Sequence, residues 1–302
     1  TRPETLFLVP GNYRFTSTAS TGIVDKNLVL IAEDPNTTVV TMEKNLLLQG
    51  TFDRILFKNI SFECDSYLMQ GTVTAANRQF DIDEVRIENC VVNLAANLAT
   101  SSTIITIQAR TAGYDARIGK CVFENVTTYS HSGNTQFTYI QVGAAETHMV
   151  FDNISLKNCT STHTARGIIS IGQVNEPIDI DIENCTFYNI NIARNTVIYA
   201  AKSEKVRIGI SNSIFHFGGT GYKLIDYVFN RATINIKNSY FFKDQTPLFN
   251  NALAEDNMNM MEYNGTPEDL FVSPNINPVA TGASFKIKDS DMATKNVGDA
   301  RW

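Results

Sequence analysis

The chain lacks the signals that would place it in a membrane or on a nucleic acid. No apolar run approaches the ~20 residues needed to cross a bilayer. The formal net charge of −6 comes without acidic or basic blocks, so there is no electrostatic footprint for nucleic acid and no polybasic membrane patch. We therefore expect no transmembrane segment and no nucleic-acid partner.

Cysteine is scarce and lacks metal-ligand spacing, with 5 residues in a chain of 302. A fold of this size needs no disulfide framework, so we interpret the cysteines as small core residues. A Cys90–Cys121 bridge requires a favourable stack geometry. Thr1 does not open a charged-then-apolar leader, so we expect that an export signal or lipid anchor has been removed or never existed.

What the chain does contain is a repeat. Residues 178–183 alternate isoleucine with acidic residues, the period-2 pattern of a strand with one apolar and one solvated face. Asn184 ends the alternation, and a second short strand begins at Cys185. Alignment on this asparagine gives anchor positions 59, 89, 120, 153, 184, 212 and 238, all asparagine except Lys120. A recurrence every ~30 residues indicates a solenoid, which permits a single domain at this length.

The positions around each anchor predict stacked β-coils. Residues two and four places before the anchor, and three after it, are apolar in every repeat, whereas no helical i, i+3, i+4 stripe persists. A β-sandwich does not need the same asparagine at the same turn, but stacked coils do. There each amide can bond to its copies above and below.

These asparagines, together with the N-terminal run from Leu6 to Tyr13, resemble the right-handed parallel β-helix of the pectate-lyase-like superfamily. The resemblance implies an all-β, single-stranded right-handed parallel β-helix, with three strands per coil, an asparagine ladder and terminal caps. The tail, residues 282–288 and 297–302, is similar to uncharacterised β-helix lipoproteins of bacterial polysaccharide-utilisation loci. That similarity implies export to the extracellular face of the outer membrane or to the periplasm.

The repeat also suggests how the chain is divided. We expect the β-helix to occupy residues 1–252, with 1–53 forming the initial coils. After residue 238 the periodicity decays into a proline-containing segment, so residues 253–302 are expected to be a C-terminal cap packed on the helix.

In pectate lyases the polysaccharide lies on the outer face of the first strand of each coil, which the resemblance places between the repeats. If Ile107, Ile140, Ile169 and Ile198 face the core, the outward side chains include only one carboxylate. They are Thr106, Gln108, Tyr139, Gln141, Ser170, Tyr199 and Asp226.

A calcium-dependent lyase needs several convergent carboxylates and a base, and this groove offers few acids. Amides, hydroxyls and tyrosines suit sugar binding, and marginal arginines can bind a uronate carboxylate. We therefore predict a non-catalytic, monomeric protein that binds an acidic, pectin-like polysaccharide or oligosaccharide, and that works with other surface glycan-utilisation proteins. The predicted binding residues are Gln108, Arg110, Tyr139, Gln141, Arg166, Ser170, Arg194, Tyr199 and Asp226. Alternatively, the tyrosines are ordinary strand residues and the arginines solvated loop charges.

Two other functions remain open. A lyase acting by β-elimination could draw its base from His131, His163, Tyr139 or Arg166, although isolated loop histidines are more often bystanders. A purely structural or adhesion protein would bind no glycan.

The acidic face of residues 179–183 permits a further interpretation. Stacking would bring Asp152 beside Glu183, and together with Asp181 they form a conceivable Ca²⁺ site. Cross-strand charge pairing, for example between Asp179 and Arg207, is the interpretation we favour. We expect no other cofactor.

Overall fold

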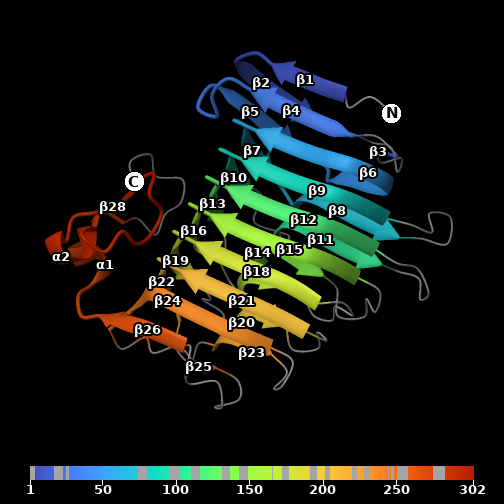
Figure 1. Cartoon of the computed structure of the whole chain (residues 1–302). Coiled ribbons are helices and arrows are strands. Elements are labelled where there is room, and N and C mark those ends of the chain that lie inside the picture. Colours follow the sequence, from blue (N-terminus) through green and yellow to red (C-terminus); the bar gives the residue numbers. More distant parts are fainter. Residues whose placement is uncertain are drawn as a thin grey trace.

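The computed structural model describes residues 4–16, 23–24, 27–73, 80–94, 103–109, 116–130, 137–142, 149–164, 166–171, 177–190, 196–200, 205–219, 223–227, 232–243, 245, 248–249, 258–274 and 283–302. The chain winds into a stack of coils whose strands are parallel from one coil to the next (Figure 1). Three ladders of strands, here called sheets I, II and III, run along the stack. The predicted all-β parallel β-helix is confirmed.

Each coil passes through the sheets in a fixed order. Sheet I contains β3 (Ile23–Val24), the start of β6 (Leu46–Lys58), β8 (Tyr67–Val73), β11 (Thr103–Ala109), β14 (Phe137–Val142), β17 (Gly167–Ser170), β20 (Thr196–Ala200), β23 (Lys223–Tyr227) and β25 (Leu248–Phe249). Sheet II contains β1 (Glu4–Leu8), β4 (Leu28–Ala32), the rest of β6, β9 (Phe80–Glu88), β12 (Ala116–Glu124), β15 (Met149–Lys157), β18 (Pro177–Glu183), β21 (Lys205–Ser211) and the start of β24 (Ala232–Phe242). Sheet III contains β2 (Gly11–Phe15), β5 (Thr38–Met42), β7 (Ser61–Cys64), β10 (Val91–Leu94), β13 (Thr127–Ser130), β16 (Thr160–Thr162), β19 (Thr186–Ile190), β22 (Ile214–Phe217), the end of β24 and β26 (Met258–Tyr263).

The turn from sheet II to sheet III carries the asparagine ladder. Its residues have positive φ values between 45° and 59°, a left-handed conformation that asparagine tolerates better than most residues. Side-chain amides link neighbouring coils, as from Asn89 to Asn59 at 2.7 Å and from Asn238 to Asn212 at 2.8 Å. The residue after each asparagine is buried in the core. The ladder asparagines are Asn59, Asn89, Asn125, Asn158, Asn184, Asn212 and Asn238.

Two anchors predicted from the sequence are wrong. Lys120 and Asn153 are paired with each other, but they lie within the nine-residue strands β12 and β15. The turn residues of these coils are Asn125 and Asn158, whose side chains bond at 3.1 Å. The period-2 pattern continues through both long strands, so an alignment five residues early matches nearly as well.

The cysteines are core residues, as predicted from the sequence. All five are free and buried, so the conditional Cys90–Cys121 bridge does not form. Cys159 and Cys185 follow ladder asparagines, whereas Cys121 lies inside β12. Burial raises the pKa of the Cys90 thiol to about 12, which keeps it protonated and unreactive.

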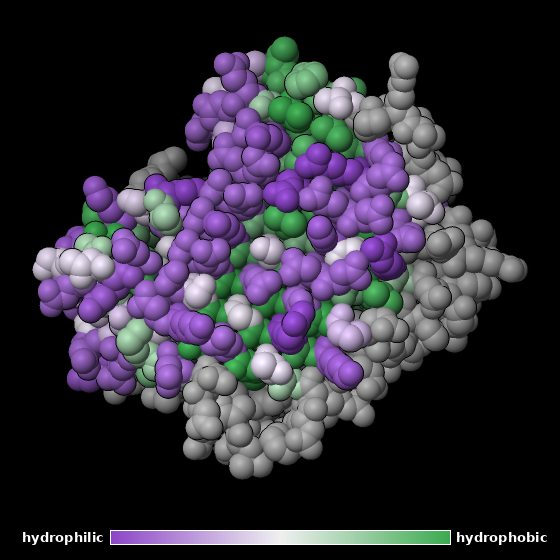
Figure 2. Space-filling model, in the orientation of Figure 1, coloured by the Kyte–Doolittle hydropathy of each residue, from purple (hydrophilic) through white to green (hydrophobic). Residues whose placement is uncertain are grey.

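Sheet II presents a polar outer face to solvent. Figure 2 shows hydrophilic side chains spread across its strands, with apolar side chains visible between them and at the N-terminal end of the stack. There Leu6, Phe7 and Val9 are exposed on and beside β1.

The C-terminal residues fold against the outside of sheet III (Figure 1). They form α1 (Pro267–Leu270), β27 (Phe271–Ser273), β28 (Ser284–Ile287) and α2 (Ser290–Ala293). A capping box between Thr266 and Asp269 begins α1, and the Asp289 side chain caps α2. The domain boundary at residue 252 stays a prediction. Among the described residues, no helix is long and apolar enough to span a membrane.

An aromatic and aliphatic cluster joins this cap to the coils. Phe285 lies 5.4 Å from Tyr188 of β19, and Phe271 lies 6.3 Å from Phe242 of β24, between ring centroids. His216 of β22 stacks on Tyr188 at 4.7 Å. The outer face of sheet III at β19, β22, β24 and β26 is therefore an interior surface of the molecule.

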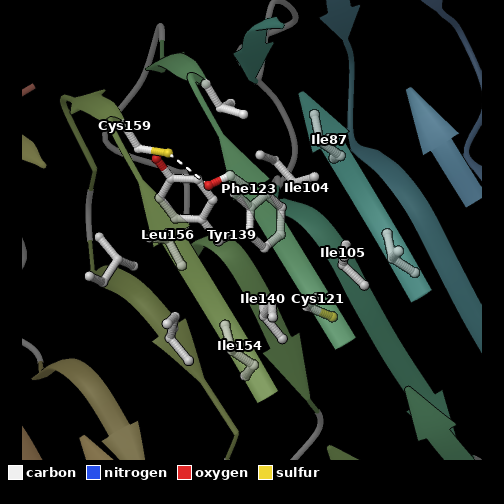
Figure 3. Close-up of a cluster of buried hydrophobic side chains, with 14 of the residues drawn as sticks. Ile87, Ile104, Ile105, Cys121, Phe123, Tyr139, Ile140, Ile154, Leu156 and Cys159 are labelled. Carbon is white, nitrogen blue, oxygen red and sulfur yellow. Dashed lines mark hydrogen bonds between the residues drawn. The ribbon is translucent and has the colours of Figure 1, made fainter. Parts of the chain in front are cut away.

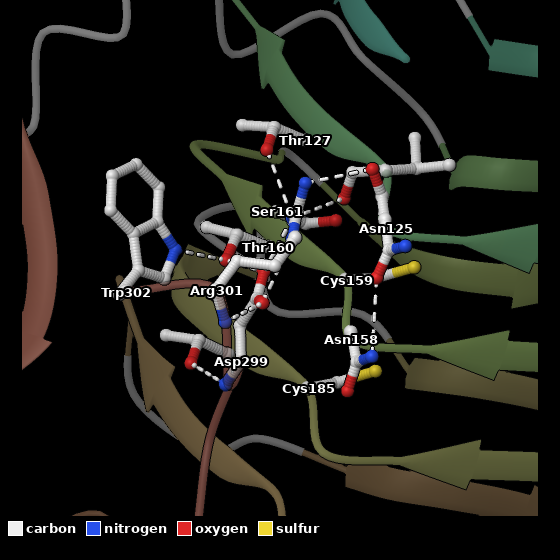
Figure 4. Close-up of polar contacts among 12 residues, drawn as sticks. Asn125, Thr127, Asn158, Cys159, Thr160, Ser161, Cys185, Asp299, Arg301 and Trp302 are labelled. Carbon is white, nitrogen blue, oxygen red and sulfur yellow. Dashed lines mark hydrogen bonds and ion pairs between the residues drawn. The ribbon is translucent and has the colours of Figure 1, made fainter. Parts of the chain in front are cut away.

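Residues 296–302, here called the strap, continue from the cap across sheet III (Figure 4). The Gly298 amide donates to the Asn212 carbonyl at 2.7 Å, and Gly298 has a φ of 78°. A Cβ at this glycine would lie 2.8 Å from the Thr186 hydroxyl. Both its conformation and its close approach therefore favour glycine.

Candidate functional site

The candidate site is a row of polar side chains on the outside of sheet I. Its members pair in register from strand to strand: Gln70, Thr106, Gln141, Ser170, Tyr199 and Asp226. We call this set the polar row. Strand spacing places successive members ~4.8 Å apart along the stack.

The neighbours of the row establish which way it points. On both sides of Thr106, Gln141, Ser170 and Tyr199 the neighbouring residues belong to the hydrophobic core, for instance Ile169 and Ile171 around Ser170. Alternation along a strand then directs the row away from the core. Gln141, Tyr199 and Asp226 are partly exposed, while Thr106 and Ser170 are buried.

The prediction that Tyr139 faces outward is wrong. Its side chain is fully buried, and its ring meets that of Phe123 edge-on at 4.9 Å (Figure 3). The Ser161 hydroxyl donates to the Tyr139 hydroxyl at 2.8 Å. The pairing of β14 with β17 shifts between Phe137 and Ile140, and this irregularity breaks the simple alternation at Tyr139.

Burial also argues against Tyr139 as a catalytic base. Removal from water raises the pKa of its phenol well above the ordinary value. A phenolate would therefore be costly to form. We consequently assign Tyr139 to the core rather than to the glycan-binding or catalytic set.

The remaining predicted binding residues are distributed unevenly. Gln141, Ser170, Tyr199 and Asp226 lie in the row, and Arg166 is exposed immediately before β17. Gln108 is in β11, paired with Thr72, but its side chain lies outside the described residues. Arg110, Arg194 and His131 also lie outside them.

Sequence reasoning missed the first member of the row, Gln70. It pairs with Thr106, and the Asn45 side chain donates to its Oε1 at 2.8 Å. The strand pattern that contains Gln70, residues 67–71, lies one coil before the strand of Thr106.

Gln141 has the least satisfied side chain in the row. Its Oε1 is buried and accepts no hydrogen bond from the described part of the chain. Leaving a buried acceptor unpaired costs about 1–3 kcal/mol. A ligand hydroxyl could bond to this carbonyl only after the side chain turned toward solvent.

His163 occupies a turn rather than a catalytic pair. It has a φ of 61° directly after β16, and its Nδ1 lies 2.9 Å from Asn189 Nδ2. Burial lowers the pKa of its imidazole, favouring the neutral form. An amide, not a carboxylate, thus orients this ring.

The proposed acidic cation site is not assembled. The residue beside Glu183 is Lys157, with 3.6 Å between charged atoms, so the prediction that Asp152 lies there is wrong. Asp181 accepts from the Asn153 amide at 3.0 Å, and Asp152 pairs with Arg117 at 2.9 Å. Within the described ranges, no cluster of three or more His, Cys, Asp or Glu side chains could hold a metal.

Charge pairing instead organises the outer face of sheet II. The Arg117 guanidinium contacts Asp81 at 2.9 Å, Asp83 at 3.0 Å and Asp152 at 2.9 Å, bridging β9, β12 and β15. These carboxylates raise the pKa of Arg117 further above its ordinary value. Arg207 similarly pairs with Asp179 across β21 and β18, as predicted. These charges satisfy one another within the sheet.

One comparison with known proteins gives a match. Residues 180–302 match a family model described as "Domain of unknown function (DUF5123)". The matched part runs from within β18 to the strap, so it contains Tyr199 and Asp226 together with the whole cap. A search of curated proteins finds no match.

Proposed function

We propose that the protein binds a linear polysaccharide along the polar row, without chemical turnover. The observation that carries this proposal is the in-register alignment of six hydrogen-bonding side chains along the stack. A polymer that repeats its hydroxyl groups can meet such a row at many successive positions. Multiple weak contacts then add along one chain.

The chemistry of the row suits sugars. The partly exposed Tyr199 offers an aromatic surface, and the partly exposed Gln70, Gln141 and Asp226 add polar side chains on either side of it. Arg166 and the half-exposed Lys223 lie at the amino ends of β17 and β23, where they can pair with uronate carboxylates. We therefore retain an acidic, pectin-like glycan as the proposed ligand.

The same considerations favour binding over β-elimination. The row contains one carboxylate, Asp226, and no histidine. Tyr139 is buried in the core, and His163 is held by Asn189. Kinship with pectate-lyase-like β-helix proteins and a location at the cell surface or in the periplasm are part of this proposal. They rest on the resemblance of the asparagine ladder and the tail.

Affinity electrophoresis in gels containing polygalacturonate tests the proposal. The affinity that retards the wild-type protein should fall roughly tenfold in Gln141→Ala, because one amide side chain that contacts the ligand is lost. Asn235→Ala, an exposed change on sheet II, is the matched control and should migrate like wild type.

Two outcomes would contradict the proposal. The first is equal retardation of wild type and Gln141→Ala, or none at all. The second is a protein-dependent rise in the absorbance of unsaturated products, which would replace binding by lyase activity.

A further inference from the structure

A second concave surface lies in the cap, away from the polar row. It is a cleft of about 200 Å³ between β28, the end of α2 and the strap. Trp302 and Phe285 contribute its aromatic lining, while Lys286 and Asn296 contribute polar side chains. This volume accommodates a single sugar ring rather than an extended oligosaccharide.

Trp302 is held rigidly at this cleft. Its indole Nε1 donates to the Thr160 hydroxyl at 2.8 Å, and its ring meets Phe285 at 5.7 Å with a 70° interplanar angle. Figure 4 shows the indole ring projecting away from Asp299 while its nitrogen points toward Thr160. The side chain remains partly exposed. A fixed aromatic surface loses little conformational entropy when a ligand stacks on it.

The backbone beneath the indole is fixed as well. The Arg301 guanidinium donates to the Asn125 carbonyl at 2.7 Å and to the Thr127 hydroxyl at 3.0 Å. Asp299 also lies at the cleft, but its carboxylate is buried and is engaged by Arg301 at 2.9 Å and by Thr160 at 2.7 Å. Its negative charge is therefore compensated from within the strap.

The exposed rim supplies a cation and an amide. Lys286 is exposed on β28, and Asn296 is exposed with a φ of 52° after α2. An aromatic surface combined with a hydrogen-bonding, cationic rim matches a hydroxylated ring that carries an anionic substituent. Apolar ligands would leave the Lys286 and Asn296 groups without a role.

We propose that this cleft is a second glycan site, which binds one acidic sugar residue against Trp302. It is separate from the polar row and does not depend on the function proposed for that row. Its location in the part of the chain that matches the family model gives that segment a chemical role of its own.

The chain provides its own probe, because Trp302 is its only tryptophan. Fluorescence of the intact protein should change saturably on titration with galacturonic acid or digalacturonate, and galactose should bind roughly tenfold more weakly for want of the charge. Lys286→Gln should weaken the acidic sugars by a similar factor and abolish their preference over galactose.

Two variants separate this site from the polar row. Ala293→Gln places a longer side chain in the cleft from the exposed end of α2 and should remove the signal. Tyr199→Ala should keep the fluorescence titration intact while it reduces retention in polygalacturonate gels. Each variant is compared with wild type by circular dichroism and thermal unfolding.

The proposal is overturned by the absence of a saturable change, by unchanged affinity in both Lys286→Gln and Ala293→Gln, or by loss of the signal in Tyr199→Ala. A proline-rich peptide that changes the fluorescence where sugars do not would assign the cleft to a protein partner instead. Failure of the cleft titration with intact gel retention would leave the polar-row proposal standing.

Discussion

Two rows of polar side chains run along this solenoid, and within the described residues the strap lies across one of them, the threonine row of sheet III. On sheet III, Thr127, Thr160 and Thr186 pair in register, and the strap bonds to all three hydroxyls. On sheet I, the carbonyl of Gln141 in the polar row is buried and has no partner among the described residues. The two rows share a register from coil to coil but differ in the contacts that the described chain makes to them.

The comparison shows that a row of hydroxyl groups, repeated from coil to coil, can bind a polar segment that lies across it. The Asp299 carboxylate and the Trp302 indole of the strap both bond to the Thr160 hydroxyl. The Arg301 guanidinium bonds to Thr127 and to the Asn125 carbonyl in the preceding coil. The strap thus behaves as an internal ligand that runs along the stack. A polysaccharide on sheet I would use the same principle with its own repeated groups.

The largest loss of stability should follow from removing contacts between the strap and the threonine row of sheet III. Asp299→Ala removes the carboxylate that binds Arg301 and Thr160 and leaves the guanidinium partly buried without its partner. We expect a loss of about 3 kcal/mol in the free energy of unfolding. Urea unfolding measures this loss, with Glu262→Gln on the exposed edge of β26 as a control near zero. Equal stability of the two variants would show that the strap does not hold sheet III.

The second prediction concerns the pH dependence of stability that arises where the cap packs on the outer face of sheet III. Burial lowers the pKa of His216 to about 4, while Glu268 opposes the shift. In the unfolded state the His216 pKa is near 6.5, so the unfolded chain binds the proton more readily than the folded one. The contribution of neutral His216 to stability is therefore complete above pH ~6.5 and is lost as the pH falls toward 4. We expect a loss of about 2 kcal/mol over that window.

Unfolding of wild type and His216→Gln across pH 4 to 7 checks this expectation. Asn189 donates its backbone N–H to His216 Nδ1 at 3.2 Å, a bond that protonation would abolish. Glutamine keeps an acceptor but does not titrate, so its curve should be flatter. Parallel curves for the two proteins would contradict the assignment.

The third prediction concerns the polar row on sheet I. Tyr199→Ala should reduce glycan affinity roughly tenfold through loss of a stacking surface. The free energy of unfolding should change by less than about 1 kcal/mol, because the side chain is partly exposed. Calorimetric titration and urea unfolding of the same variant give both quantities. A large loss of stability with unchanged affinity would reverse the contrast between the two rows.

The smallest effect is expected on sheet II, whose charges pair with one another at the surface. Arg117→Ala removes three ion pairs, yet these are solvent-exposed, and screening limits the total to about 1 kcal/mol. The difference from wild type should shrink further in 1 M salt. A salt-insensitive loss of several kcal/mol would mean that the charged face is a structural element comparable to the strap.

The coil itself was predictable because its signal is local. Alternation over residues 178–183, ended by Asn184, defines one sheet II strand and one turn, and the same pattern recurs along the chain. The position of the turn was predicted wrongly only in the coils of β12 and β15, where the alternating pattern continues beyond the residue taken as the anchor. There Asn125 and Asn158 could not be distinguished from Lys120 and Asn153 by periodicity alone.

The site was partly predictable for the same reason. Gln141, Ser170, Tyr199 and Asp226 follow from period-2 alternation and occupy the row. Tyr139 does not, because a pairing irregularity beside it depends on the neighbouring coil.

The docking of the strap lay beyond local patterns altogether. Thr160 and Asp299 are 139 residues apart and meet only after the stack has formed. Residues 253–302 could therefore be expected to form a cap, but the contacts that they make could not be foreseen.

Hydrogen–deuterium exchange with and without polygalacturonate tests the central claim most directly. If the polysaccharide lies along the polar row, protection should increase in β14, β17 and β20 and leave β12, β15 and β18 unchanged. Protection confined to the sheet II strands, or no change in any strand at saturating glycan, would contradict the claim.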